Sequence, residues 1–522
     1  MSRRDALAVA AVAAWCTLLV GAVLLPFAAP GVLAHRDMLV LDSPALSVGA
    51  FGFGDLPARN APQDGLLALA GLVLPASWLA RALIAAGAVA GVGGAVALVR
   101  HVGGGPVAAA AAVTLTLLNP AVVERLLQGQ WSLAVAGWLL PAIAWAGLSG
   151  RTGLAWAGMV PAALTPTGAV LGGLVGGLTV HRGGAGAKTS GAKASGGAPG
   201  DAPLTWAVAG ALCLPWLVPA AWAALSGAGT GTATAASAAA FAPRAEAHLG
   251  TGGTLLSLGG IWNAGAAPGS RAAGFGIFGL ALTLLCLLGR RAVARPLWAA
   301  AAVGLVIPLA AWLVPGWFAW AVATVPGAGL LRDAHKFVLL VVPALVAGLG
   351  GLSRLGTKER WAWLALVLAV VQALDFPAAL RRLAPVPDPT PAAVEEISDG
   401  RDVLVAGSTG LVEVDGVPTV DYRDKALPTV ASGQLVVDGV TVDAPSARWS
   451  AADQAWRAGD LDALADLGVG WVIDSDGEVL AQTTAPAAPA WPKVAGVVLL
   501  VLWAAAAPAA LAARRLRVTG RS

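Results

Sequence analysis

The sequence predicts an α-helical polytopic membrane protein that carries a small α/β domain near its C-terminus. Only 12% of the 522 residues are charged and 57% are hydrophobic, whereas soluble domains carry about 25% charged residues. Apolar runs recur at the length of roughly 20 residues that a helix needs to cross the hydrocarbon core. Because backbone groups in lipid must be hydrogen-bonded within their own segment, these runs predict helices rather than strands. We expect roughly 10–12 transmembrane or re-entrant helices.

The first apolar run predicts an uncleaved helix over residues 8–34, since it is longer than the 7–15 residues typical of a signal peptide. Arg3 and Arg4 precede it and indicate a cytoplasmic N-terminus. Residues 35–65 then form a polar outer loop, and the short apolar run 66–75 is expected to lie in the outer interface. Further helices are predicted over residues 77–99, 106–123 and 131–148.

Residues 153–180 are apolar but have basic residues at both ends, with Arg151 before them and His181 and Arg182 after them. A single span would place these residues on opposite sides of the membrane, against the tendency of Lys and Arg to stay inside. Pro166 cannot donate a helical hydrogen bond. A re-entrant pair of short helices that turns at Thr165–Gly168 resolves the topology, although one span remains the alternative. Thr165 and Thr167 then face an internal cavity, or the glycine-rich helices simply pack closely.

The remaining elements alternate across the membrane. Residues 183–203 are rich in Gly, Ala and Ser and predict a flexible cytoplasmic linker, and residues 226–273 form a long outer loop. Helices are predicted over residues 204–225, 274–289, 297–314, 337–352 and 361–376. Lys and Arg fall on one side at nearly every turn of this arrangement.

The composition changes after residue 377, where charge and Pro content rise and apolar runs shorten. Four segments have the length and β-branched content of strands, and residues 449–468 predict an amphipathic helix that ends before Gly468. We therefore divide the chain into a transmembrane domain (1–377), an extracytoplasmic α/β domain (378–490) and a C-terminal anchor with a basic cytoplasmic tail (491–522).

Several functional classes are excluded by what the sequence lacks. It contains no phosphate-binding P-loop, no dinucleotide fingerprint after a strand, no HExxH and no CxxC. Its net charge of +4 reflects basic residues in short loops, so it does not indicate a nucleic-acid partner. Cys16, Cys213 and Cys286 all fall inside apolar runs, which fits neither a disulfide framework nor a metal site.

The acidic loop, residues 35–65, is the first candidate site. Asp37 and Asp42 follow the first helix closely, and a partly desolvated carboxylate there can act as a general base toward a sugar hydroxyl. Such carboxylates can also hold a divalent cation, Mg²⁺ or Mn²⁺. His35 and Arg36 are candidate substrate-binding residues, because Arg pairs well with phosphate. The alternative is ordinary loop polarity, with a helix-capping role for Asp64.

A second candidate is LLRDAHKF, residues 330–337, at the outer start of a helix. Arg332, His335 and Lys336 place three potentially cationic groups within five residues. This group suits a lipid-linked phosphate or pyrophosphate. The alternative is that the basic side chains only anchor the helix at the interface by snorkelling.

Two further segments supply candidate binding residues. Arg125 lies at an outer helix end, where structural pairing with a loop carboxylate competes with a role in binding. Trp262, Asn263 and Arg271 belong to the long outer loop and either line a site that opens outward or pack within the loop. Arg244, Glu246 and His248 share that choice.

Six stretches carry a resemblance to a known family: HRDMLVLDSPALSVGAFGFGDLPARNAPQD, NPAVVERLLQGQWSLAV, ALTPTGAVLGG, SLGGIWNAGAAPGSR, LLRDAHKF and LADLGVGWVI. They resemble an actinobacterial family of uncharacterised polytopic membrane proteins, which is similar to the GT-C glycosyltransferases. That group includes arabinofuranosyltransferases and mannosyltransferases of the mycobacterial cell envelope. The resemblance implies a GT-C-like fold, a polyprenyl-phosphate sugar donor, and an inverting transfer on the outer face of the plasma membrane.

The resemblance also implies roles for particular residues. The general base falls on Asp37, with Asp42 as the competitor, and the donor phosphate falls on the basic 330–337 segment. The acceptor is a cell-envelope glycan or lipid. Two other functions remain open, an envelope lipid or glycan transporter or flippase, and a non-catalytic scaffold for envelope assembly. Nearly charge-free spans without an internal repeat favour the transferase over the transporter.

Overall fold

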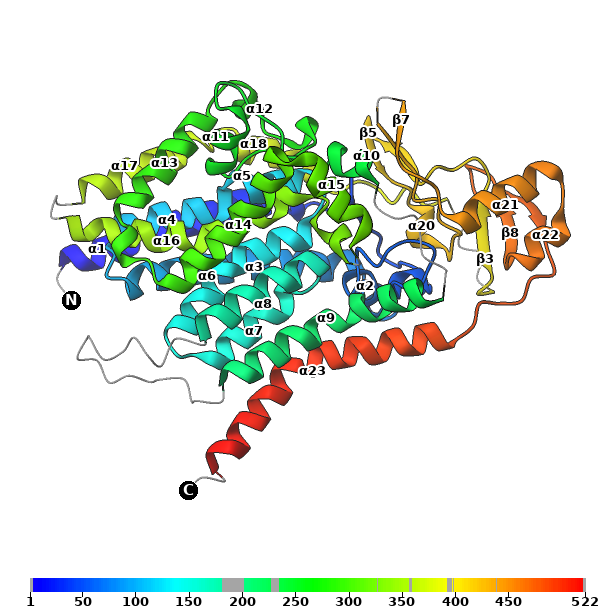
Figure 1. The fold of residues 1–522 in the computed structure, drawn as a ribbon, viewed down its shortest axis with the longest axis horizontal. Coiled ribbons are helices and arrows are strands. Elements are labelled where there is room, and N and C mark those ends of the chain that lie inside the picture. Colours follow the sequence, from blue (N-terminus) through cyan, green and yellow to red (C-terminus); the bar gives the residue numbers. More distant parts are fainter. Residues whose placement is uncertain are drawn as a thin grey trace.

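The computed structural model describes residues 3–180, 201–226, 234–325, 327–355, 359–391, 397, 399–437 and 439–519. Within these residues nine helices are long and apolar enough to cross a membrane, and two shorter apolar helices, Pro166–Val180 and Gly276–Leu288, accompany them. The helices are packed side by side, and the strands gather at the opposite end of the molecule from the N-terminus (Figure 1). The chain is thus a multi-pass membrane protein with small sheets near its C-terminus, as the sequence predicts.

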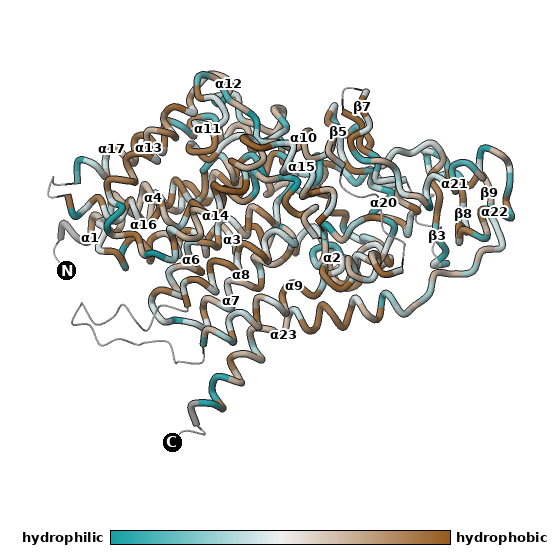
Figure 2. Tube along the Cα trace, viewed as in Figure 1, coloured by the Kyte–Doolittle hydropathy of each residue, from teal (hydrophilic) through white to brown (hydrophobic). Residues whose placement is uncertain are grey.

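The distribution of hydrophobic residues along the chain follows the same division. Hydrophobic residues dominate the helical part, and hydrophilic residues concentrate in the strand-bearing end and the short connections (Figure 2). The nine candidate spans are Ala6–Ala28, Ala76–His101, Pro106–Leu127, Trp131–Leu148, Asp201–Leu225, Arg295–Leu313, Ala334–Leu355, Arg360–Leu383 and Trp491–Arg517. Only 11% of the first span is buried in the protein, whereas 89% of Pro106–Leu127 is buried, so the latter forms part of the central core.

The first helix ends earlier than the sequence predicts. α1 runs from Arg3 to Leu24, and a 3-10 turn, Leu25–Ala28, follows it. Pro26 lies in that turn, where a missing backbone N–H cannot continue the helix. The predicted tail of the helix is instead strand β1, Leu33–His35, which pairs antiparallel with β2, Met38–Val40. The start of the acidic loop is therefore a tight hairpin with Asp37 in its turn.

Residues 153–180 form the predicted pair of short helices. α7 (Thr152–Ala162) and α8 (Pro166–Val180) are separate helices joined by a short turn, in which the Thr165 hydroxyl accepts a hydrogen bond from Gly168 N at 3.1 Å. Both faces of this turn are packed against protein, and Thr167 is buried. The glycines of α8 allow the neighbouring helices to pack closely, which the sequence predicts as the alternative to an internal cavity. The predicted linker 183–203 lies largely outside the described residues, and α9 (Asp201–Leu225) begins at its end.

Two spans are interrupted near the strand-bearing end of the molecule. α4 (Pro106–Leu118) gives way at Asn119 to α5 (Pro120–Leu127), whose first turn Asn119 caps by accepting a hydrogen bond from Val122 N. A turn at residues 128–130 then leads into α6 (Trp131–Leu148). The predicted helix 337–352 begins as a 3-10 helix, η7 (Ala334–Val341), and continues as α16 (Val342–Gly351).

The other helices agree with the sequence in place, with some additions. α15 occupies a stretch in which the sequence predicts no helix, and short helices divide the long loop 226–273. Their bounds are α2 Gln63–Gly71, α3 Ala76–His101, α10 Ala235–Ala240, α11 Gly250–Leu256, η4 Ala264–Ala266, α12 Gly269–Ala272, α13 Gly276–Leu288, α14 Arg295–Leu313, α15 Pro315–Thr324, α17 Arg360–Val371, α18 Phe376–Leu380 and α23 Trp491–Thr519.

The α/β domain contains one mixed sheet and two hairpins. Strand β8 (Val469–Ile473) lies between β3 (Asp402–Val405), to which it is parallel, and β9 (Val479–Gln482), to which it is antiparallel. Helices α21 and α22 pack on this sheet around Leu404, Ala452 and Leu464. The hairpins and helices are β4 Leu411–Val414 with β5 Val417–Val420, β6 Leu435–Val437 with β7 Val440–Asp443, α20 Arg423–Ala426, α21 Ala447–Ala458 and α22 Leu461–Asp466.

The acidic loop and the α/β domain share a hydrophobic core. Val32, Ala34, Leu39 and Leu41 of the first hairpin form one buried cluster, and Val420 and other side chains of the α/β domain pack against it. A backbone bridge between Val32 and Val386 joins the same two parts. The division at residue 378, drawn from composition, therefore crosses a packed contact that fixes the loop against the domain.

Candidate functional site

Asp37 is held at the turn of the β1–β2 hairpin by the loop between α5 and α6. Its backbone N donates to Gln128 O at 3.1 Å. Its two carboxylate oxygens accept hydrogen bonds from Gln128 Nε2 at 3.2 Å and Gln130 Nε2 at 3.0 Å. The side chain is nonetheless exposed to solvent. Asp37 thus combines a fixed position with access to a ligand.

Gly129 makes this approach possible. Its φ of +89° lies in the left-handed region that L side chains rarely adopt. A Cβ at this position would come within 2.2 Å of Met38 N and 2.8 Å of Asp37 N. The backbones of the two turns are therefore in direct contact, and no side chain fits between them.

The charges that act on Asp37 come from its own loop and from the 330–337 segment. Protein atoms that desolvate the carboxyl raise the pKa of Asp37, while the two glutamine hydrogen bonds and the charge of Lys336 act in the opposite direction. The charge of Arg59 also acts on Asp37. The acidic loop and the 330–337 segment thus lie close enough for the charge of Lys336 to act on Asp37.

Three cations and one further carboxylate complete the Asp37 cluster, which we define as Asp37, Arg59, Arg332, Lys336 and Asp443. Arg332 Nη1 lies 2.6 and 2.8 Å from the two oxygens of Asp443, and Arg59 Nη2 lies 3.6 Å from the same carboxylate. Lys336 Nζ is 3.7 Å from Asp333. Partial desolvation and the neighbouring charge of Arg332 lower the pKa of Arg59 to about 10, so it stays cationic at neutral pH.

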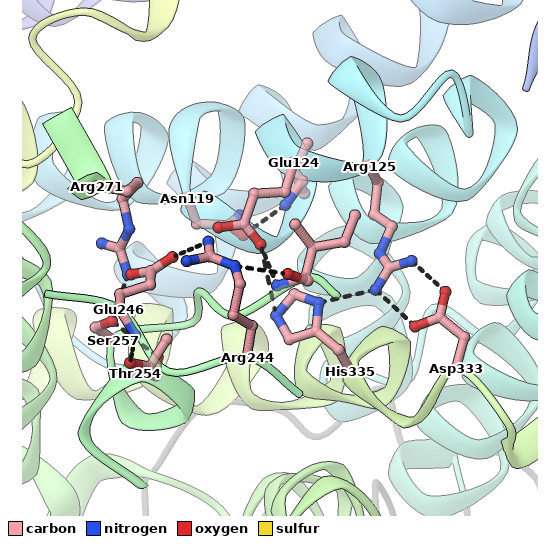
Figure 3. A network of polar contacts seen from close by, with 12 residues as sticks. Asn119, Glu124, Arg125, Arg244, Glu246, Thr254, Ser257, Arg271, Asp333 and His335 are labelled. Carbon is pink, nitrogen blue, oxygen red and sulfur yellow. Dashed lines mark hydrogen bonds and ion pairs between the residues drawn. The ribbon is translucent and has the colours of Figure 1, made fainter. Parts of the chain in front are cut away.

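The pair between Lys336 and Asp333 joins the cluster to a buried ionic network, which Figure 3 shows. Arg125 forms a two-pronged ion pair with Asp333, with Nη2 at 3.0 Å from Oδ1, and Nη2 also donates to His335 Nδ1 at 2.8 Å. His335 Nε2 lies 3.8 Å from Glu124. Arg125, Glu124 and His335 are fully buried. Arg125 and His335 therefore pair with charged groups inside the protein, and they are not accessible to a ligand. For Arg125 this is the structural pairing with a carboxylate that the sequence leaves open.

The network continues into the loop 241–271 (Figure 3). Arg271 is buried, forms an ion pair with Glu246, and donates to Ser257 Oγ at 2.7 Å. Arg244 lies 3.5 Å from Glu246, and Glu124 accepts a hydrogen bond from Ile261 N at 3.0 Å. Arg271 is thus a packed residue rather than one that lines an outward-opening site.

The other predicted binding residues take supporting positions. His35 is buried, its Nε2 lies 3.0 Å from Leu127 O, and burial lowers its pKa to about 4. Arg36 donates to Gly265 O at 3.1 Å, and burial lowers its pKa. Trp262 packs edge-to-face on Phe241, with ring centroids 4.6 Å apart. Asn263 Nδ2 donates to Gln128 Oε1 at 2.8 Å, and Gln128 in turn donates to Asp37.

The remaining acids of the loop are engaged elsewhere. Asp42 accepts a hydrogen bond from Ser77 Oγ at 2.5 Å, and its carbonyl accepts from Ala76 N at the start of α3. Asp55 pairs with Arg448 at 3.4 Å and Asp64 pairs with Lys425. The contacts of Asp42 therefore assign it a structural position at the start of α3, whereas Asp37 is exposed to solvent.

The donor set does not fit the expected divalent cation. The Asp37 carboxylate faces two amide NH₂ groups and the cation Lys336, whereas Mg²⁺ and Mn²⁺ require several oxygen ligands. Asp42, the second expected ligand, is bonded to Ser77. Across the described part of the chain, no three His, Cys, Asp or Glu side chains gather as metal ligands.

Sequence reasoning missed four members of the site. Gln128 and Gln130 follow a helix and carry no charge, although the Gln-Gly-Gln pattern marks a turn with paired amides. Arg59 lies in the acidic loop, and no pattern in the neighbouring sequence indicates where its side chain lies. Asp443 ends a strand more than a hundred residues from Arg332, and only the fold brings the two together.

Comparison with known proteins gives one similarity. No protein-family model matches the sequence, and no curated protein matches it. Among solved structures, the arabinofuranosyltransferase AftD from mycobacteria is similar to this chain at a TM-score of 0.43 and 17% identity. The similarity covers 91% of this chain and 36% of that one, so the chain spans about a third of the length of AftD.

Proposed function

We propose that the chain is a membrane glycosyltransferase of GT-C type, which moves a sugar from a polyprenyl-phosphate donor to a cell-envelope glycan or lipid. The observation that carries this proposal is the Asp37 cluster, in which a solvent-accessible carboxylate lies near Arg59 of its own loop and Lys336 of the 330–337 segment, with Arg332 beside them. A carboxylate beside a cationic group is the arrangement that hydroxyl activation and phosphate departure require together. The resemblance in sequence supports the same activity.

Asp37 serves as the general base. It accepts the proton of an acceptor hydroxyl as that oxygen bonds to the anomeric carbon of the sugar. The bond from that carbon to the donor phosphate oxygen breaks, and its electron pair leaves with the polyprenyl phosphate. Lys336 and Arg59 offset the negative charge that remains on the phosphate, as cations near a developing oxyanion do. No step needs a metal ion.

The same proposal places the cluster outside the cytoplasm. The N-terminus and the C-terminal end of α23 lie toward the end of the helical part that is remote from the strands (Figure 1). Arg100 lies in the last turn of α3, Arg290 follows α13, and Arg514 lies in the C-terminal part of α23, and such basic residues near helix ends favour the cytoplasmic side. Both termini are then cytoplasmic and the α/β domain is extracytoplasmic. This orientation can be tested by introducing single cysteines at Asp462 or Arg515 and probing each with a membrane-impermeant thiol reagent.

The activity is tested by reconstituting the full chain in liposomes with a radiolabelled polyprenyl-phosphate sugar and a cell-envelope glycan acceptor. Transfer of label to the acceptor, unaffected by a chelator, is the expected result. Movement of the donor between leaflets without transfer would instead indicate a flippase. Retention of the acceptor with neither activity would indicate an assembly scaffold.

A further inference from the structure

Two chains of hydrogen bonds end on the Asp37 carboxylate, and each runs in one direction. In the first, Gly265 N donates to Asn263 Oδ1 at 3.0 Å. Asn263 Nδ2 then donates to Gln128 Oε1 at 2.8 Å, and Gln128 Nε2 donates to Asp37 Oδ1 at 3.2 Å. In the second, Arg125 Nη1 donates to Gln130 Oε1 at 3.1 Å, and Gln130 Nε2 donates to Asp37 Oδ2 at 3.0 Å.

The first group of each chain fixes the orientation of every amide after it. A backbone N–H can only donate, so the oxygen of Asn263 must face Gly265 and its NH₂ must face Gln128. A guanidinium likewise has no acceptor, so the oxygen of Gln130 must face Arg125. Reversal of either glutamine amide would leave two oxygens or two donors face to face. Both NH₂ groups are therefore directed at Asp37.

The anchors of the two chains are themselves immobilised. Arg125 is fully buried and bound to Asp333 and His335. Asn263 caps the 3-10 turn η4. Groups held by several hydrogen bonds or ion pairs have little freedom to rotate, and hydrogen bonds in such networks reinforce one another. The amides are thus held before any substrate arrives.

We propose that Gln128 and Gln130 are positioning residues, which Asn263 and Arg125 lock with both amide NH₂ groups toward Asp37, so that this carboxylate is kept ionised and aimed. This inference rests on the proposed function, in which Asp37 is the base. Hydrogen bonds to the charged form of a carboxyl lower its pKa and oppose the desolvation that raises it. Loss of either amide therefore raises the pKa of Asp37.

The test measures the protonation of Asp37 without relying on transfer. A carbodiimide reagent couples to protonated carboxyls, and peptide mass spectrometry of the full chain in nanodiscs gives the pH midpoint of labelling at Asp37. Gln128→Met and Gln130→Met remove one NH₂ each at similar volume. We expect each to move the midpoint upward by about one pH unit, while labelling of the exposed Asp462 in the same samples stays unchanged.

Asn263→Asp separates the lock from the amide it holds. The aspartate still accepts from Gly265 N but no longer donates to Gln128, so the Gln128 amide is free to reverse. We expect Asn263→Asp to raise the labelling midpoint of Asp37 when Gln128 is present, and to raise it much less when Gln128 has been replaced by Met. A double-mutant cycle quantifies this difference. An equal shift in both backgrounds would show a direct charge effect and overturn the lock.

The two proposals fail in different ways. Unchanged midpoints in Gln128→Met and Gln130→Met would overturn the positioning role whether or not the chain transfers sugar. Shifted midpoints in a chain whose Asp37→Asn variant transfers normally would leave the positioning intact and remove Asp37 as the base. Where transfer is measurable, the acid limb of its pH profile should move with the labelling midpoint.

Discussion

Arg332 binds both carboxylate oxygens of Asp443 through a single nitrogen, at 2.6 and 2.8 Å. The first residue precedes the helix η7 and the second ends strand β7, so this pair ties the α/β domain to the membrane domain at the Asp37 cluster. Arg332 also lies over the Phe241 ring, 4.1 Å from its centroid. One ion pair thus orients a cation of the cluster and fixes the β6–β7 hairpin.

Asp443→Asn should loosen that hairpin. A hydrogen bond to a charged group contributes about 1.5–3 kcal/mol, and the pair is mostly shielded from solvent. We expect faster hydrogen exchange of residues 435–443 with little change in the sheet β3–β8–β9. Asp453→Asn removes a carboxylate from an ion pair with the exposed Arg457 and should leave exchange unchanged. Equal exchange in both variants would contradict the role of Asp443.

Lys336→Gln should weaken donor binding and also slow turnover. The substitution removes a cation that we assign to the donor phosphate, at about 1.5–3 kcal/mol, or roughly a 10–100-fold rise in KM for the donor. Arg59→Gln should act in the same direction. Arg457→Gln, which changes an exposed cation on α21, is the matched control. A donor KM that is equal in all three variants would remove the cluster as the phosphate site.

Gly129→Ala should displace Asp37. The new Cβ would meet Met38 N at 2.2 Å at a φ of +89°, whereas Gly407→Ala meets nothing within 4 Å at a φ of +74°. Both carry the backbone strain of about 1–2 kcal/mol, so the difference in melting temperature isolates the clash. We expect lower stability and loss of transfer only for Gly129→Ala. Similar behaviour of the two variants would mean that the turns separate without consequence.

The pH dependence of transfer should show one acid limb that belongs to Asp37. Transfer requires the ionised carboxylate, so the rate falls as pH drops through the pKa of Asp37. Because desolvation raises that pKa, the limb should lie above the ordinary Asp value of about 3.9. His35 is also a titratable group nearby, with a pKa lowered to about 4 by burial, and His35→Gln should leave the limb in place. A limb that vanishes in His35→Gln would assign it to the histidine.

Hydropathy made the membrane fold predictable, because crossing lipid constrains length and composition together. Basic residues stand at both ends of residues 153–180, and both ends are therefore expected on the same side of the membrane. This predicts the α7–α8 pair. Helix ends were less predictable: Leu33 and Ala34 are apolar enough for a helix, but pairing of this segment with residues 38–40 and the bridge from Val32 to Val386 make it a strand. Local sequence does not contain that partner.

The candidate site was predictable only where charge stands out from an apolar background. Asp37 and Lys336 are visible in that way, and the structure brings them together. His335 and Arg125 are visible for the same reason, yet they are buried among counter-charges, since a charge inside a protein requires partners. Gln128 and Gln130 are neutral and common residue types, so nothing short of their contacts distinguishes them.

The central claim is that Asp37, and not Asp42, takes the acceptor proton, and sugar transfer by paired variants tests it most directly. In liposomes with the polyprenyl-phosphate sugar, Asp37→Asn should lower the rate by about 10²–10⁴-fold, the usual contribution of a general base. Asp42→Asn should stay within a few-fold of the unaltered chain once folding is matched by melting temperature. Full transfer by Asp37→Asn, or a loss confined to Asp42→Asn, would contradict the account.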